Sequence, residues 1–184
     1  MNYFNEKKAA QAAAYLLKLN GGKMNYMKLI KLLYLADRNT LAHHGYTITS
    51  DNYVSMNQGM VLSNVLDLIN NEVDEKESKL WAKYISVPSD YNVSLSSPDT
   101  DMLALSEVEI EILRDVFSKY GKLGVWEIVD KIHHNLKEWK NPHGSMIPVS
   151  LKEILDAVSE NKEENAKIAE DIEAADEIRK FMEE

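Results

Sequence analysis

The sequence contains no cysteine among its 184 residues. Disulfide bonds, zinc sites with thiolate ligands, iron–sulfur clusters and a cysteine nucleophile are therefore excluded. The chain also lacks an uncharged apolar run near the ~20 residues that a membrane-spanning helix needs, and its first residues do not resemble a signal peptide. We therefore expect a cytoplasmic protein without a membrane partner.

The common sequence motifs of catalysis are missing as well. The chain has no G-x-x-x-x-G-K-[ST] or G-x-G-x-x-G loop to hold phosphate groups, no G-x-S-x-G turn and no H-E-x-x-H zinc motif. The sequence therefore favours a binding protein over an enzyme, and we expect no cofactor.

Charge is distributed unevenly along the chain. The net charge is −9, whereas residues 1–50 carry +5 and residues 159–184 carry −6. An acidic protein favours basic partners and repels nucleic acid, so a nucleic-acid partner is not expected. The hydrophobic content of 45% is enough for the core of one domain.

Helical patterns occupy the first quarter of the chain. An alanine-rich helix is expected over residues 5–19, with Asn5 as its cap and Gly21 and Gly22 just beyond its end. A second helix is expected over residues 25–43, ended by Gly45. It has almost no polar face, which predicts that it lies at the buried centre of the domain.

The middle of the chain mixes helical and extended patterns. Residues 46–56 are expected to be extended, with a short strand near residues 53–55, and a helix is expected from Val61 to Asn70. A charged loop over residues 71–79 should follow. Residues 81–87 and 91–95 alternate with period two around a turn at Pro88, which predicts a small β-hairpin.

The rest of the chain predicts four more helices. Capping-box pairs, Ser106 with Glu109 and Ser150 with Glu153, begin two of them, and a shorter one is expected over residues 125–133. The last, from about residue 160 to the end, is highly charged. Its apolar stripe consists of Ile168, Ile172, Ala175, Ile178 and Met182. This helix either packs back on the domain or serves as a partner-binding arm.

Together these patterns predict a mainly α fold with a small β-hairpin. The expected organisation is a compact helical domain over residues 1–158 and an acidic amphipathic helix over residues 159–184.

Three other chemistries were weighed against the residues. His133, His134, Glu138 and His143 offer metal ligands but match no zinc spacing, so no metal site is expected. A hydrolase or transferase would use Asp37, Asp51 and His133 or His134, although a buried Asp is more often a structural ion pair or a cap. A DNA-binding regulator would need the N-terminal lysines on one surface, but the helix over residues 25–43 is too apolar for a DNA groove.

Four segments carry a resemblance to a known family. They read K-L-L-Y-L-A-D-R (residues 31–38), G-Y-T-I-T-S-D-N-Y-V (45–54), Q-G-M-V-L-S-N-V (58–65) and I-H-H-N-L-K-E-W-K-N-P-H-G (132–144). In this order and spacing they resemble the Panacea domain, the SocA-like family of bacterial antitoxins and phage-associated proteins. The chain departs from the family at Met60, where Pro is usual, and at Ser50, where Gly often precedes the Asp.

The resemblance implies a compact helical Panacea-like domain that works by protein–protein contact. It implies a type II toxin–antitoxin system, often carried by prophages and other mobile elements, in which the antitoxin binds a cognate toxin such as a translation-inhibiting, alarmone-synthetase-like enzyme. One SocA-like member instead delivers its toxin to the ClpXP protease, so a proteolytic adaptor is the alternative.

The matched segments also suggest which residues are important. The expected partner-binding residues are Lys31, Tyr34, Asp37, Asp51, Gln58 and Trp139. Tyr34 and Trp139 are equally typical of core residues. Gly45, Gly59 and Val61 are expected to be structural, with Gly59 as a backbone requirement at the entry of the third helix.

Overall fold

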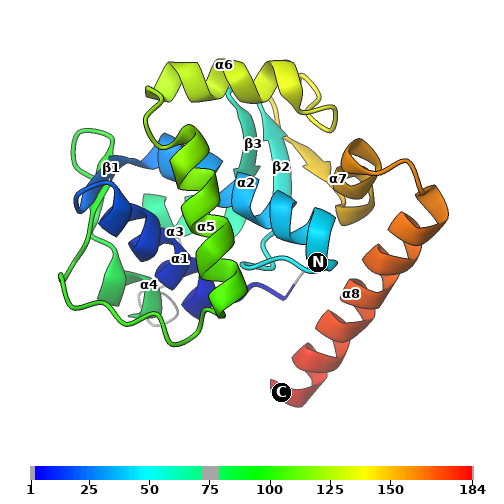
Figure 1. The fold of residues 1–184 in the computed structure, drawn as a ribbon, viewed down its shortest axis with the longest axis horizontal. Coiled ribbons are helices and arrows are strands. Elements are labelled where there is room, and N and C mark those ends of the chain that lie inside the picture. Colours follow the sequence, from blue (N-terminus) through cyan, green and yellow to red (C-terminus); the bar gives the residue numbers. More distant parts are fainter. Residues whose placement is uncertain (1–2, 72–78, 184) are drawn as a thin grey trace.

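A central helix organises the fold of this protein. The computed structural model describes residues 3–71 and 79–183 (Figure 1). In it α2 (Tyr26–His44) contacts α1 (Glu6–Leu19), α5 (Glu107–Tyr120), α6 (Val125–Asn135) and α7 (Leu151–Val158). The prediction of a mainly α fold with small β elements is confirmed.

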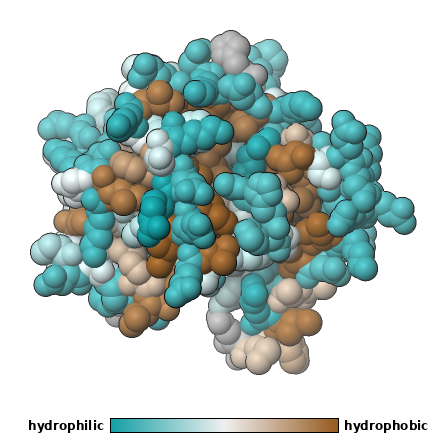
Figure 2. Space-filling model, in the orientation of Figure 1, coloured by the Kyte–Doolittle hydropathy of each residue, from teal (hydrophilic) through white to brown (hydrophobic). Residues whose placement is uncertain are grey.

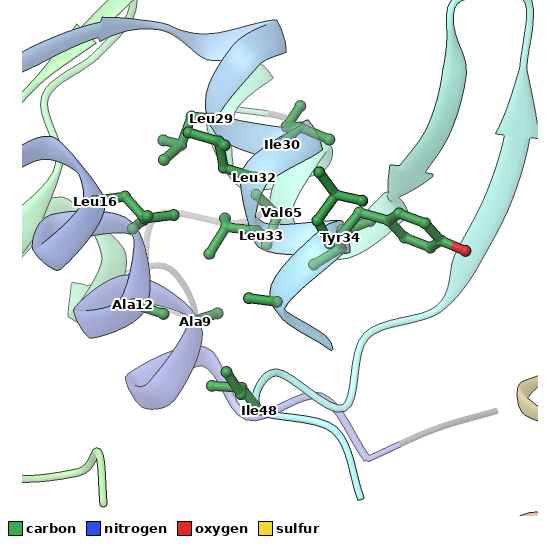
Figure 3. Close-up of a cluster of buried hydrophobic side chains, with 14 of the residues drawn as sticks. Ala9, Ala12, Leu16, Leu29, Ile30, Leu32, Leu33, Tyr34, Ile48 and Val65 are labelled. Carbon is green, nitrogen blue, oxygen red and sulfur yellow. The ribbon is translucent and has the colours of Figure 1, made fainter. Parts of the chain in front are cut away.

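The two sides of α2 pack against different partners. Figure 3 shows apolar side chains of α2 facing α1, whereas Tyr34 points the other way, toward strands β2 (Tyr53–Met56) and β3 (Gly59–Leu62). The labelled side chains that meet between α1 and α2 are Ala9, Ala12, Leu16, Leu29, Leu32 and Leu33. Because alanine side chains are small, the two helices approach closely, and burying this face supplies the main hydrophobic stabilisation.

Side chains and one glycine define the helix ends, and those at Asn5 and Gly45 were predicted from the sequence. The Asn5 side chain accepts a hydrogen bond from the Lys8 amide, and the Asn25 side chain accepts one from the Met27 amide. Gly45 ends α2 in the left-handed conformation at φ +70°, which a side chain would disfavour. The capping boxes at Ser106 and Ser150 are also confirmed.

The segment before the third helix forms a strand, which corrects one prediction. Residues 59–62 pair as β3 with β2, β5 (Ile147–Val149) joins the other side of β2, and helix α3 (Ser63–Asn70) begins only at Ser63. A short apolar run does not distinguish a buried strand from a helix, and pairing with β2 decides the outcome. Gly59 is therefore the first residue of β3, directly after the β2–β3 turn, at φ +101°, and does not begin a helix.

The predicted hairpin over residues 81–95 is also partly wrong. Residues 79–84 form helix α4 (Lys79–Tyr84), because Trp81, Tyr84 and Ile85 are buried at helical spacing. Strand β4 (Asn92–Ser94) pairs instead with β1 (Lys23–Asn25), and only isolated bridges such as Ile85 to Leu95 connect the two predicted arms. Most of the loop predicted over residues 71–79 lies outside the described residues.

The charged C-terminal segment forms helix α8 (Lys162–Glu183), which packs mainly against α7. Ala169 is buried, and Ile168 and Ile172 pack against the core. The first part of the predicted apolar stripe therefore docks on the domain. Among residues 3–71 and 79–183, no helix is long and apolar enough to cross a membrane.

The burial of α2 gives a stability prediction. Leu29→Ala should lower the free energy of unfolding by about 2–5 kcal/mol, because Leu29 is fully buried and the substitution leaves a cavity. Urea unfolding followed by circular dichroism measures the change. Leu103→Ala is the matched control, because Leu103 is 88% exposed and should change stability by less than about 0.5 kcal/mol. Equal effects of the two substitutions would contradict the central role of α2.

Candidate partner-binding site

Lys31 lies inside the protein, beneath an open cavity. Its side chain is fully buried, and Nζ donates a hydrogen bond to the Met60 carbonyl oxygen at 2.8 Å. Burial lowers the pKa of Lys31 to about 7, because removing an ammonium from water disfavours its charged form. Lys31 therefore ties α2 to β3.

The cavity above Lys31 has a volume of about 340 Å³. It lies between the first turns of α2, the β2–β3 turn, α3 and the turn at residues 144–145, and apolar side chains predominate in its lining. Gln58 stands exposed at its rim. Lys31 and Gln58, predicted from the sequence, thus belong to one cavity.

Tyr34 belongs to a buried cluster that connects α2 to the segment after α6. The Tyr34 hydroxyl donates to Glu138 Oε1 at 2.8 Å, and Arg38 Nε donates to the same oxygen at 2.6 Å. Burial, reinforced by the negative charge of Glu138, raises the pKa of Tyr34 well above its ordinary value. The ring also packs edge-on against Tyr53.

Asp37 organises the extended link that follows α2. Its carboxylate accepts hydrogen bonds from the Ile48 and Thr49 amides at 2.8 and 3.1 Å, and from the hydroxyls of Thr49 and Tyr53. Burial nevertheless raises the pKa of Asp37 to about 6, because desolvation outweighs these hydrogen bonds. The side chain is directed into the protein rather than toward a partner.

Asp51 completes the N-terminus of α3 from a distant part of the chain. It accepts hydrogen bonds from the amides of Asn64 and Val65 at 2.9 and 3.0 Å, and from the Asn64 side chain. These amides are donors that the helix itself leaves unsatisfied. Burial raises the pKa of Asp51 to about 7.

Trp139 attaches the β2–β3 hairpin (residues 53–62) at its Met56 end to the segment after α6. Its ring stacks on His133 with centroids 4.3 Å apart, and Nε1 donates to the Met56 carbonyl at 2.9 Å. The His133 ring lies so close to Gly59 that a Cβ there would stand 3.3 Å from it. Gly59 is thus needed for both its backbone conformation and this close approach.

The structure separates the six predicted residues into two groups. Gln58 is exposed and Trp139 is partly exposed, whereas Lys31, Tyr34, Asp37 and Asp51 are buried. Gly45 and Gly59 adopt left-handed conformations, and Val61 lies buried in β3. The four buried residues support the β2–β3 hairpin and the link before it, and these segments shape the cavity.

The two carboxylates considered for acid–base chemistry are engaged in structural contacts. Asp37 and Asp51 each accept several hydrogen bonds and have almost no contact with solvent. Within the part of the chain that the structure describes, no group of three or more His, Cys, Asp or Glu side chains is placed to hold a metal.

Comparison with protein families gives one match. The model described as "Antitoxin SocA-like, Panacea domain" matches residues 29–140, more than half of the chain. The chain belongs to this family. Comparisons with curated proteins and with solved structures returned no match. The Panacea region includes all six predicted residues and the cavity lining from Ile30 to Leu66. It does not include the lining residues Tyr26, Met27, Gly144 and Ser145, or the elements α1, β1, β5, α7 and α8.

From the sequence, Glu138 was considered as a metal ligand, whereas it anchors the buried cluster of this Panacea domain. The spacing of Tyr34 and Arg38, four residues apart, places both on one helix face and is the signal that could have indicated a shared partner. The turn at Gly144 and Ser145 could not be assigned to the cavity, because only the β2–β5 pairing brings it there.

The raised pKa of Asp51 gives a pH prediction. Between about pH 4 and 7 the folded protein holds a proton that the unfolded chain releases, so this group stabilises the fold as pH falls from 8 toward 5.5. Urea unfolding at both pH values should therefore give a wild type less stable at pH 8, by at most about 1.4 kcal/mol per pH unit from this group. Asp51→Asn should reduce this dependence, and an unchanged dependence in the variant would contradict the assignment.

Lys31 should show the opposite slope at higher pH. Because its folded pKa is lowered to about 7, the unfolded chain binds the extra proton between about pH 7 and 10, and stability from this group rises with pH in that window. Lys31→Met should flatten the rise between pH 7 and 9.5, measured by urea unfolding. Lys122→Met, at an exposed position, is the control and should leave the slope unchanged.

Proposed function

We propose that this Panacea protein is an antitoxin of a type II toxin–antitoxin system, which neutralises its toxin by direct binding. The match of residues 29–140 to the SocA-like antitoxin domain carries the proposal. The buried hydrogen bonds of Asp37 and Asp51 favour binding over turnover, because neither carboxylate is presented to a substrate.

The proposed contact surface is the rim of the cavity above Lys31. It combines an apolar hollow with exposed polar groups at Asn57, Gln58 and Ser145, and the exposed side chain of Met146 follows directly. Protein interfaces concentrate their binding energy where a few side chains fill such a pocket, surrounded by a polar rim. A volume of about 340 Å³ suits an apolar side chain of the toxin and its immediate neighbours.

The buried and partly buried residues of the site act indirectly in this proposal. Lys31, Asp37 and Trp139 hold the hairpin, link and adjoining turn in one arrangement, so the rim is formed before the toxin arrives. A preformed surface loses less conformational entropy on binding and so binds more tightly. We infer occlusion of the toxin's active surface as the mechanism.

The proposal predicts that bulk at the rim weakens toxin binding. Gln58→Arg should lower affinity for the toxin encoded beside this gene at least about ten-fold, because the longer charged side chain obstructs the hollow. Co-expression growth assays and calorimetry with the purified toxin measure the effect. Ser118→Arg, which adds the same side chain at an exposed position on α5, is the control.

Two results would contradict the proposal in different ways. A wild-type protein that neither rescues growth nor binds the neighbouring toxin would remove the antitoxin function. Rescue accompanied by loss of the toxin that depends on ClpXP would replace occlusion with proteolytic delivery, whereas occlusion leaves the toxin level unchanged.

A further inference from the structure

The last two turns of α8 expose a group of large apolar side chains. Ile178, Phe181 and Met182 are 62%, 81% and 79% exposed. Their spacing of three and four residues places them on one side of the helix. Isolated exposed apolar residues are common on protein surfaces, but a contiguous group is typical of an interaction site.

The opposite side of α8 is the one that attaches to the domain. Asn165 is buried and donates to Asp156 Oδ1 at 2.9 Å, Ala169 is buried, and Asp176 accepts a hydrogen bond from the Tyr3 amide at 3.0 Å. These contacts define the rotation of the helix about its axis along most of its length.

This attachment directs the apolar group away from the domain. At about 100° per residue, Ile178, Phe181 and Met182 lie roughly 120–160° around the helix from the buried Asp176. The docked face of α8 therefore cannot cover them. The predicted apolar stripe divides into a docked first part and an outward second part.

The helix also stands partly off the domain. A cavity of about 480 Å³ lies between α8 and the link over residues 45–50, lined from the helix side by Asp171, Ile172, Ala175, Asp176 and Arg179. In Figure 1 α8 runs along one edge of the molecule, from α7 to the C-terminus. Its outer surface is therefore open to a large partner.

The exposed surface of α8 has a net negative charge. Exposed basic side chains are present at Lys162, Lys167 and Arg179, and Arg179 pairs with Asp176. They are outnumbered by exposed carboxylates: Glu163, Glu164, Glu170, Asp171, Glu173 and Glu177. In Figure 2 the side where α8 runs is largely hydrophilic, and hydrophobic residues gather near its lower end. A complementary surface is basic and contains an apolar recess.

We propose that the outward face of α8 is a second docking surface for the toxin, taking a basic surface with an apolar recess. The inference rests on the proposed antitoxin function and adds a contact outside the matched Panacea region. Ile178, Phe181 and Met182 enter the recess as an amphipathic helix enters a groove, and the carboxylates pair with the basic residues around it. A basic surface is typical of an enzyme that acts on nucleotides or RNA, which makes occlusion by an acidic helix effective.

The test replaces the apolar group in the full-length chain. Ile178→Ser, Phe181→Ser and Met182→Ser, made together, should weaken binding of the neighbouring toxin at least ten-fold and reduce growth rescue. The urea midpoint should be unchanged, because the three side chains are exposed. Leu103→Ser, which removes an exposed apolar side chain elsewhere, is the matched control and should bind as the wild type does.

A second measurement avoids dependence on the folding of the triple variant. A photo-crosslinking phenylalanine analogue at position 181 should crosslink to the toxin, whereas the same analogue at position 103 should not. Wild-type affinity should also fall as salt is raised, because the carboxylates that surround the apolar group are exposed to solvent.

The outcomes separate this inference from the proposed function. A triple variant with wild-type affinity and no crosslink from position 181 overturns the second surface and leaves the antitoxin function standing. A wild-type chain that does not bind the toxin overturns both. Crosslinking of position 181 only to a second copy of this chain, with loss of self-association in the triple variant, assigns the face to a homodimer and overturns the proposal.

Discussion

The structure depends on the hydrogen bonds of three polar side chains on the buried helix α2. Lys31, Tyr34 and Asp37 follow each other at intervals of three along α2, so they share one face, and none is appreciably exposed. A buried polar group without a hydrogen-bond partner costs about 1–3 kcal/mol, so each must find one in the surrounding chain. Each does so in a different segment.

These three contacts hold the β2–β3 hairpin and the segments next to it against α2. Lys31 reaches the Met60 carbonyl of β3, Tyr34 reaches Glu138 after α6, and Asp37 reaches the link before β2. One helix thereby positions segments separated by up to about a hundred residues. The apolar contacts with α1 on its other side provide burial without such specificity (Figure 3).

This arrangement explains how residues without exposed side chains shape the surface around the cavity. Asp51 closes the start of α3, Trp139 holds the Met56 end of β2, and the cavity rim is formed between them. The acidic outer face of α8 lies outside this framework and is attached through α7 and Asp176. The Panacea region and the terminal helix therefore present separate surfaces.

The sequence by itself determined most of the helices, because caps, glycines and apolar periodicity act locally. Asn5, Gly45 and the two capping boxes lie where they were predicted, and the apolar character of α2 was sufficient to place it at the centre. The order of the family segments was sufficient to predict the Panacea domain.

Only the tertiary structure decided the strands and the roles of the polar residues. Residues 59–62 become a strand because β2 pairs with them, and residues 79–84 become a helix because Trp81 and Tyr84 pack against the core. Lys31, Asp37 and Asp51 each form hydrogen bonds with backbone groups of another segment, and such contacts carry no sequence signal. The two carboxylates also accept hydrogen bonds from side chains. Non-local pairing therefore accounts for both the corrected elements and the division between buried supports and exposed rim.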